Sequence, residues 1–290
     1  MNNFINEIKT KGYAFPIKIL EKNEANYFYD EYLRLIKKIN SNTLKIEHKF
    51  KSHLLFKWLD NLISNKKIID LASQIIGKNI LCWNSIIFFK PKYSKKFVGW
   101  HEDKTYWKLK NNKVLTFSVA VTESLPVNGC LKILHERRNV EYKINDIRNN
   151  MLARGQDAII DDQEKFSYVK LEPGESAVFQ QNIIHGSDPN FSDKDRMLIA
   201  LRYISTDNFT SANHKTAKLV SGFDNYKFYE HEPATINNFD NFNIKFHQKL
   251  MSKQAEIFAK DRLKKKYLSL FSFLVKINFL RGFYYKIFHK

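Results

Sequence analysis

The sequence predicts an α+β fold in which an all-β core is flanked by helices. The first 77 residues carry apolar side chains at helical spacing. Residues 78–206 instead consist of short β-prone apolar runs separated by turn signals. Few helical patterns lie between these runs, so we expect the strands to form an antiparallel sandwich or barrel.

Two helices are expected before residue 78. Asn23 is a suitable N-cap for the first, because apolar residues follow it at helical spacing. The second covers 62–76 and ends at Gly77, a residue type that commonly terminates helices. The apolar positions of the first helix are Phe28, Tyr32, Leu35, Ile36 and Ile39.

Five strands are expected in the core. A polar insertion at 141–165 is interpreted as helix or loop, and the pattern after residue 206 is polar and irregular until about 243. The turn sequence EPGES precedes the fourth strand. The predicted strands are 80–89, 114–121, 131–134, 177–180 and 197–204.

Composition excludes several classes of protein. Hydrophobic residues make up 43% and aromatic residues 14% of the 290 residues, which is enough for a folded core. Only Cys82 and Cys130 are cysteines, so the chain is no disulfide scaffold and suits a reducing compartment. The N-terminal segment lacks the apolar core of a signal peptide and no apolar run is long enough to span a membrane, so we expect a soluble cytoplasmic protein.

The net charge of +18 is divided unevenly between two expected parts of the chain. We expect a single domain over 1–250, with helices in 1–77 and the core at about 78–206, and a C-terminal tail over 251–290. The tail holds ten Lys/Arg and two acidic residues, so it contributes +8.

The tail mixes cations with apolar side chains and reads as a basic amphipathic helix. Such a helix over 261–290 can dock on an anionic membrane or an acidic protein, or pack on the core or a second subunit. No nucleic-acid recognition motif accompanies the charge, so no nucleic-acid partner is expected. The sequence leaves the oligomeric state open.

Two segments of the core carry residues that bind metals. In GWHEDKTYW, His101 and Asp103 are two residues apart, which places both side chains on one face of a strand. His185 follows an apolar run much later in the chain. Two histidines and one carboxylate form the facial triad that binds non-haem Fe(II) and leaves coordination positions open.

Arg196 adds a carboxylate-binding group to this set. It lies eleven residues after His185, at the start of a strong strand, where a short hairpin would bring the two strands together. Because a guanidinium grips a carboxylate through two parallel hydrogen bonds, an iron site beside Arg196 is the minimal machinery for 2-oxoglutarate.

Three segments together resemble the phytanoyl-CoA dioxygenase family. They are GWHEDKTYW, LTFSVAVTESLPVNGCLKIL, and LEPGESAVFQQNIIHGSDPN followed by DRMLIALRYI. The resemblance covers roughly 12–204 and is expected to extend to about 233. It implies a double-stranded β-helix, the jelly-roll or cupin-like fold, and the use of Fe(II), 2-oxoglutarate and O2.

The resemblance also implies roles for individual residues. His101, Asp103 and His185 match the iron ligands, and Arg196 matches the arginine that binds the distal carboxylate of 2-oxoglutarate. Ser187 is expected to add a hydroxyl at the same end of the co-substrate. Because Asp103 retains the carboxylate ligand, the resemblance argues against halogenation.

The expected activity is therefore that of an oxidoreductase. The enzyme would hydroxylate a small anionic organic substrate and release succinate and CO2. Where the family commonly has Gly-Ser-His, this chain reads HERRN, which adds positive charge near the rim of the site. The expected substrate-binding residues are Lys104, Tyr106, Trp107, Arg137 and Arg138.

Two other functions stay open at this point. One is a jelly-roll metalloenzyme that does not use 2-oxoglutarate, from which Arg196 would distinguish the leading hypothesis. The other is a non-enzymatic basic protein on the same fold that associates with membranes or nucleic acids.

Overall fold

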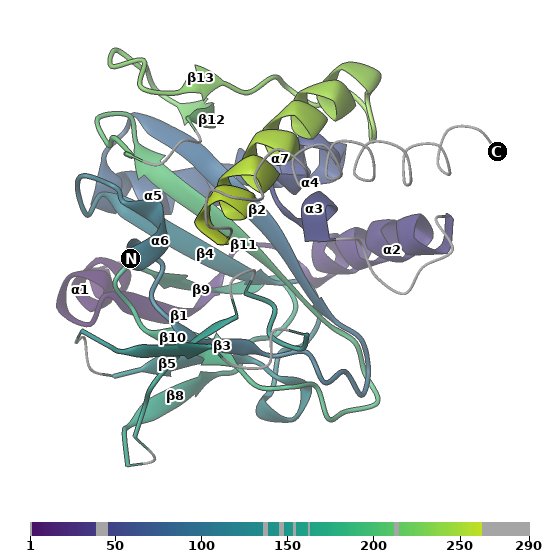
Figure 1. Cartoon of the computed structure of the whole chain (residues 1–290), viewed down its shortest axis with the longest axis vertical. Helices are drawn as coiled ribbons and strands as arrows, with labels where there is room; N and C mark the ends of the chain where they lie inside the picture. Colours follow the sequence, from purple (N-terminus) through teal and green to yellow (C-terminus); the bar gives the residue numbers. More distant parts are fainter. Residues whose placement is uncertain are drawn as a thin grey trace.

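The computed structural model describes residues 2–38, 46–135, 139–144, 148–152, 155–161, 163–211 and 215–262. Two β-sheets face each other, and helices cover the outer face of the larger one (Figure 1). The larger sheet has seven strands and the smaller sheet has four. The core is therefore rich in sheet and of the jelly-roll type, with flanking helices, as the sequence predicts.

Both sheets mix strands that are far apart in the chain. In spatial order, the larger sheet contains β1 (Tyr13–Lys18), β9 (Glu175–Phe179), β4 (Val114–Ala120), β11 (Arg196–Ser205), β2 (Ile80–Lys90), β12 (Thr216–Ser221) and β13 (Glu230–His231). The smaller sheet contains β3 (Val98–His101), β10 (His185–Ser187), β5 (Leu131–Leu134) and β8 (Phe166–Val169). A separate pair consists of β6 (Tyr142–Ile144) and β7 (Gln156–Ala158).

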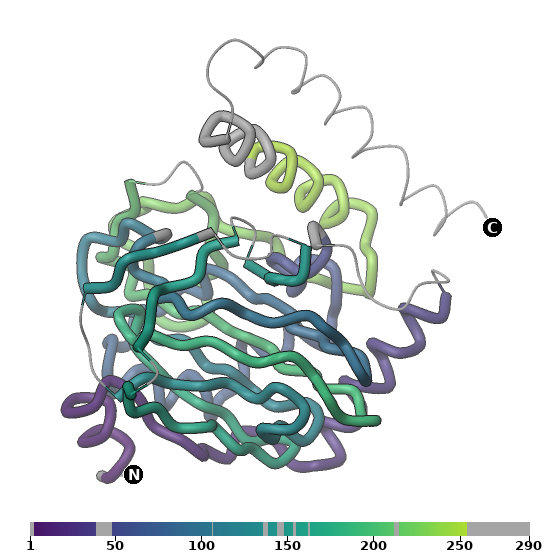
Figure 2. Tube along the Cα trace, turned by 60° about the horizontal axis from the view of Figure 1, so that its bottom comes forward, coloured from purple at the N-terminus to yellow at the C-terminus, as the bar shows by residue number. Residues whose placement is uncertain are grey.

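The longer helices lie at the periphery of the sheets. Figures 1 and 2 place the first and last helices on opposite sides of the molecule. The α-helices are α1 (Asn2–Thr10), α2 (Lys22–Lys38), α3 (Ile46–Lys49), α4 (Lys57–Ile63), α5 (Lys66–Ile76), α6 (Lys104–Trp107) and α7 (Asn241–Arg262). Two short 3-10 helices are η1 (Ser52–Leu54) and η2 (Pro126–Asn128).

Strand β11 is the centre of the larger sheet. It pairs antiparallel with β2 on one side and with β4 on the other, and all ten of its residues are buried. Because successive side chains of a strand point to opposite faces, β11 supplies both layers of the protein. Met197, Ile199, Leu201 and Tyr203 join the core under the helices, whereas Arg196, Leu198, Ala200 and Arg202 face the space between the sheets.

The five predicted strands correspond to β2, β4, β5, β9 and β11. The structure also contains strands where none was expected. β1 lies within the part interpreted as helical, and β6 and β7 lie in the insertion interpreted as helix or loop. β12 and β13 follow residue 206, where the polar pattern indicated irregular chain.

The C-terminal helix crosses the boundary expected after residue 250. α7 begins at Asn241 and ends at Arg262, so 251–262 continue a helix that starts in the expected domain. Leu250 and Met251 are buried against Leu54 of η1. Residues 263–290, most of the expected basic tail, lie outside the described residues. Within the described ranges, none of the helices has the length and hydropathy needed to cross a bilayer.

Candidate active site

The two histidines predicted as metal ligands lie side by side on neighbouring strands of the smaller sheet. His101 ends β3, His185 begins β10, and the two residues are direct Cα partners in this antiparallel pair. Their ring centroids are 4.2 Å apart. Asp103 joins them, so that one potential ligand atom from each residue lies within 4.8 Å of the others. All three residues are buried.

Asp103 reaches this position differently from the sequence expectation. β3 ends at His101, and Asp103 has helical backbone angles (φ −71°, ψ −31°) at the N-cap of α6. The prediction that His101 and Asp103 leave the same face of one strand is therefore wrong. The turn into α6 brings the carboxylate to the histidines instead.

Both imidazoles are held by backbone carbonyls. Nδ1 of His101 lies 2.9 Å from the oxygen of Gly99, and Nδ1 of His185 lies 2.9 Å from the oxygen of Ile183. A carbonyl can only accept, so each Nδ1 carries the proton and each Nε2 presents its lone pair. Burial, and for His101 also the neighbouring His185, lowers the pKa of both rings, to about 3 for His101. Neutral imidazoles are the form that binds metals.

The carboxylate of Asp103 also fits a metal. Its Oδ1 accepts a hydrogen bond of 3.4 Å from Arg202, whereas its Oδ2 is buried with no hydrogen-bond partner. A buried anionic oxygen without a partner is costly unless a cation binds it. Two neutral histidines and one carboxylate are the donor set typical of a non-haem Fe(II) site.

A positively charged region lies at one end of the cavity between the sheets. Arg196 is the direct Cα partner of Lys90 on β2, and both side chains are almost completely buried. Arg196 donates to the carbonyls of Gly129 (2.8 Å) and Phe88 (3.4 Å), and its Nε is buried without a partner. Burial lowers the pKa of Arg196 to about 10, so it stays charged at neutral pH.

Lys90 is held beside Ser187. Its Nζ donates to the hydroxyl of Ser187 at 2.6 Å and also to the backbone oxygen of Asp188. Burial, together with the charge of Arg196, lowers the pKa of Lys90 well below its ordinary value. Among the described residues, neither Lys90 nor Arg196 forms an ion pair with a carboxylate.

The cavity connects the histidines to this positively charged end. Arg202 lies near its other end, where the guanidinium contacts Asp103. The lining residues are Phe88, Val98, His101, Thr116, Ser118, Leu131, Phe179, His185, Ser187, Arg196, Leu198, Ala200 and Arg202.

The expected substrate-binding residues have different positions. The Lys104 side chain is exposed, and it does not line the cavity. Trp107 is buried beneath the guanidinium of Arg202. The distance from the guanidinium carbon to the centroid of the Trp107 ring is 4.9 Å. The Tyr106 side chain, Arg137 and Arg138 lie outside the described residues. Glu102, which lies between the first two predicted ligands, accepts a hydrogen bond of 2.7 Å from Thr105.

The sequence counted Lys90 and Arg202 only among the cations near the metal-binding strands and gave them no role in the site. In the structure Arg202 lines the cavity, and Lys90 contacts Ser187, which lines it too. Arg202 lies on the same strand as Arg196 and an even number of residues away, so both side chains point to one face of the sheet. This alternation could have indicated Arg202 from the sequence. Lys90 ends an eleven-residue strand, but its partner Arg196 lies more than a hundred residues away. Only the register of β2 against β11 reveals that pair.

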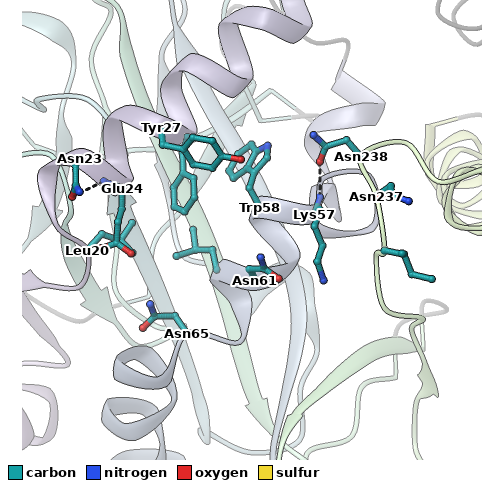
Figure 3. Close-up of a pocket in the computed structure, with 13 residues that line it drawn as sticks. Leu20, Asn23, Glu24, Tyr27, Lys57, Trp58, Asn61, Asn65, Asn237 and Asn238 are labelled. Atoms are coloured by element: carbon teal, nitrogen blue, oxygen red, sulfur yellow. Dashed lines mark hydrogen bonds between the residues drawn. The ribbon is translucent and has the colours of Figure 1, made fainter.

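A larger hollow than this cavity lies elsewhere on the described surface. A groove of about 620 Å³ runs between α2, α4 and residues 236–238 (Figure 3). Its lining is mostly amides and aromatic rings, including Asn61, Tyr27 and Trp58. It contains none of the buried histidines or arginines described above, so the candidate active site is the smaller cavity inside the barrel.

A jelly-roll-type barrel with a buried set of two histidines and one aspartate defines the class of non-haem iron oxygenases. The chain belongs to the phytanoyl-CoA dioxygenase family, whose family model matches residues 22–198.

Named relatives agree with this class. The chain is 27% identical over 200 residues to a probable alpha-ketoglutarate-dependent hypophosphite dioxygenase from Stutzerimonas stutzeri, covering 66% of this chain and 68% of the relative. It is 21% identical over 226 residues to an ectoine dioxygenase from Nocardia farcinica, covering 68% and 75%.

Solved structures share the fold. The apo structure of the non-haem monooxygenase ThoJ superimposes with a TM-score of 0.74 at 23% identity, covering 86% of this chain and 95% of that one. CytC3 with Fe(II) and alpha-ketoglutarate gives a TM-score of 0.62 at 21% identity, covering 83% and 95%.

Proposed function

We propose that this chain is an Fe(II)- and 2-oxoglutarate-dependent dioxygenase that hydroxylates a small anionic organic substrate and releases succinate and CO2. One observation supports this most directly. The buried His101, Asp103 and His185 set lies beside a cavity that both histidines and Arg196 line, and the buried Lys90 is the strand partner of Arg196. Among the described residues, neither of these two cations pairs with a carboxylate. A dicarboxylate that binds the metal through one end would give these two cations an anionic partner through its other end.

Each residue has a defined role in this proposal. Nε2 of His101, Nε2 of His185 and the unpartnered Oδ2 of Asp103 would hold the metal. Arg196, Lys90 and the hydroxyl of Ser187 would bind the distal carboxylate and fix the orientation of 2-oxoglutarate. When bound, Fe(II) supplies the redox chemistry that couples decarboxylation of 2-oxoglutarate to oxidation of a C–H bond.

The protein also isolates the reaction. The apolar side chains of Phe88, Leu131, Phe179 and Leu198 line the cavity between the two charged ends. These groups cannot hydrogen-bond to water, so they favour a dry cavity in which reactive species are protected from side reactions.

The test measures co-substrate binding and turnover separately. Anaerobic addition of Fe(II) and 2-oxoglutarate should give the metal-to-ligand absorption band of this class, and air should then give succinate. Acyl-CoA thioesters, amino acids and phosphonates should be screened for stimulation of succinate release. Absence of both the band and the succinate would contradict the proposal.

Variants identify the residues responsible. His101→Ala and His185→Ala should lose the band. Arg196→Gln should keep the metal but require far more 2-oxoglutarate for half-saturation. If Arg196→Gln left 2-oxoglutarate affinity unchanged, the assignment of Arg196 to the distal carboxylate would be wrong, and wild-type protein that binds the metal but not 2-oxoglutarate would instead be a metalloenzyme that does not use this co-substrate.

A further inference from the structure

We propose that Arg202 and Thr116 form an anion-binding site for the substrate, on the opposite side of the metal set from Arg196. The ligand of this site is a small oxyanion group, such as the carboxylate or phosphonate of the substrate. This inference rests on the proposed function and identifies the part of the cavity that would recognise the substrate.

The position of Arg202 separates it from the co-substrate end. Arg196 and Arg202 lie on the same face of β11, six residues apart, which is about 20 Å of strand. Arg196 contacts the carbonyls of Gly129 and Phe88, whereas Arg202 contacts Asp103. A five-carbon dicarboxylate bound to Arg196 and the metal leaves the region around Arg202 for a second ligand.

Arg202 is a buried cation with incomplete partners. Its side chain is 7% exposed, and its one hydrogen bond in the described part of the chain is the 3.4 Å contact with Asp103. Within the described residues, its Nε is buried without a hydrogen-bond partner. The guanidinium stacks over Trp107, which in turn packs edge-on against Trp83. This stacking fixes the orientation of the planar guanidinium, whose rigid fork of N–H groups suits an oxyanion.

Thr116 provides independent support. It is the direct Cα partner of Arg202 on β4, and both residues line the cavity. Directly opposed residues have Cβ atoms only about 5 Å apart. The Thr116 hydroxyl is buried and has no hydrogen-bond partner. A ligand that accepts from both the guanidinium and this hydroxyl removes two unsatisfied donors from one place.

The charge balance of the cavity also supports an anionic ligand at Arg202. Arg196, Arg202 and a divalent metal carry more positive charge than Asp103 and doubly charged 2-oxoglutarate can neutralise, even before Lys90 is counted. A residual positive charge in a buried site is costly until a further anion enters. An anionic substrate group at Arg202 supplies it.

The experiment measures equilibrium binding, not turnover. Protein loaded with Ni(II) and 2-oxoglutarate, which does not turn over, is titrated with methylphosphonate, acetate and the uncharged dimethyl sulfone. We expect the two anions to bind and the sulfone not to bind. Arg202→Gln should weaken anion binding about 30-fold, as expected for a lost hydrogen bond to a charged group. Thr116→Val should weaken it about fivefold.

Controls assign each outcome. Arg202→Gln and Thr116→Val should change 2-oxoglutarate affinity by less than about threefold, whereas Arg196→Gln should show the reverse pattern. If Arg202→Gln weakens 2-oxoglutarate as much as Arg196→Gln does, Arg202 belongs to the co-substrate site and the inference is overturned. If Arg202→Gln loses Ni(II) because Asp103 moves, Thr116→Val decides, since the Thr116 hydroxyl forms no hydrogen bond with Asp103 among the described residues.

Failure of this inference is distinguishable from failure of the proposed function. If the wild-type protein binds Ni(II) and 2-oxoglutarate but neither anion, only the Arg202 and Thr116 site is overturned. If it does not bind 2-oxoglutarate, the proposed function itself fails.

Discussion

Arg196 lies directly opposite Lys90 on the neighbouring strand, so two buried cations face the same end of the cavity. Like charges at close range in a poorly solvated site repel, which is why the pKa of Lys90 is lowered by burial and by Arg196. The pair therefore costs stability in the unliganded protein. A bound carboxylate would convert this cost into binding energy.

Lys90→Met should show that the buried charge of Lys90 lowers stability and strengthens 2-oxoglutarate binding. Met fills a similar volume without a charge, so we expect equal or higher thermal stability and about tenfold or greater loss of 2-oxoglutarate affinity. Anaerobic titration and thermal unfolding measure the two effects. Lys132→Met is the matched control, because Lys132 pairs with the Asp188 carboxylate at 2.6 Å and should leave 2-oxoglutarate binding unchanged. Equal loss of affinity in both variants would contradict the assignment of Lys90.

Metal binding should be visible as stabilisation of the folded protein. A ligand that binds only the folded state at about one hundred times its Kd adds roughly 2.7 kcal/mol. We therefore expect Ni(II) to raise the Tm of the wild-type protein and not that of Asp103→Ala. Glu102→Ala is the matched control, because its carboxylate is hydrogen-bonded to Thr105. A similar Ni(II) shift in wild type and Asp103→Ala would show that the metal binds elsewhere.

The sequence predicted which residues lie together better than it predicted the backbone that brings them together. His101, Asp103 and His185 were chosen by residue type and spacing, and the structure brings them together. The strand argument for Asp103 was wrong because β3 ends at His101, two residues earlier, and Asp103 is already the N-cap of α6. Periodicity cannot locate such a boundary when the segment between two elements is only a few residues long.

Elements that depend on partners were also missed. β1 is short and contains Pro16, which a strand tolerates only at a sheet edge, and β1 is indeed the first strand of its sheet. The sequence named Lys90 and Arg202 as cations near the metal-binding strands, but their roles depend on the registers of β2 and β4 against β11, which place Lys90 opposite Arg196 and Thr116 opposite Arg202. Register joins segments that are far apart in the chain, so no local pattern contains it.

A buried acid behind the larger sheet should make the fold sensitive to low pH. Glu232 accepts from Thr216 at 2.7 Å and from His53 at 2.6 Å, and it pairs with Lys51. Burial alone would raise the pKa of Glu232, but the charges of Lys51 and His53 bring it down to about 2. Its folded pKa therefore lies below the ordinary value of 4.5.

The sign of the pH effect follows from this shift. The stabilisation from ionised Glu232 is complete above the ordinary pKa and is lost as the pH falls towards 2. We expect Glu232→Gln to lower the free energy of unfolding by about 3 kcal/mol at neutral pH, since it leaves Lys51 buried without a charged partner. The difference should shrink in urea unfolding series at progressively lower pH. Glu230→Gln, an exposed neighbour, should show no such dependence, and a constant difference for Glu232→Gln would contradict the assignment.

Gly129 connects the backbone to the positively charged end of the cavity. The Gly129 carbonyl accepts a hydrogen bond of 2.8 Å from Arg196. The backbone of Gly129 adopts a φ of +74°. A Cβ at this position would lie 2.2 Å from the oxygen of Asp188 and 2.7 Å from that of Pro189, so the backbone would have to move. Gly129→Ala should therefore lower both stability and 2-oxoglutarate affinity.

Gly77→Ala separates the two causes of this loss. Gly77 also has a positive φ, +91°, but a Cβ there would meet no atom within 4 Å. Gly77→Ala should lower the free energy of unfolding by only about 1–2 kcal/mol, through backbone strain, and should leave 2-oxoglutarate binding normal. Gly129→Ala should cost more than this in urea unfolding and should also weaken 2-oxoglutarate binding, because the displaced carbonyl no longer positions Arg196. Equal stability losses and unchanged affinity would show that Gly129 contributes only its backbone conformation.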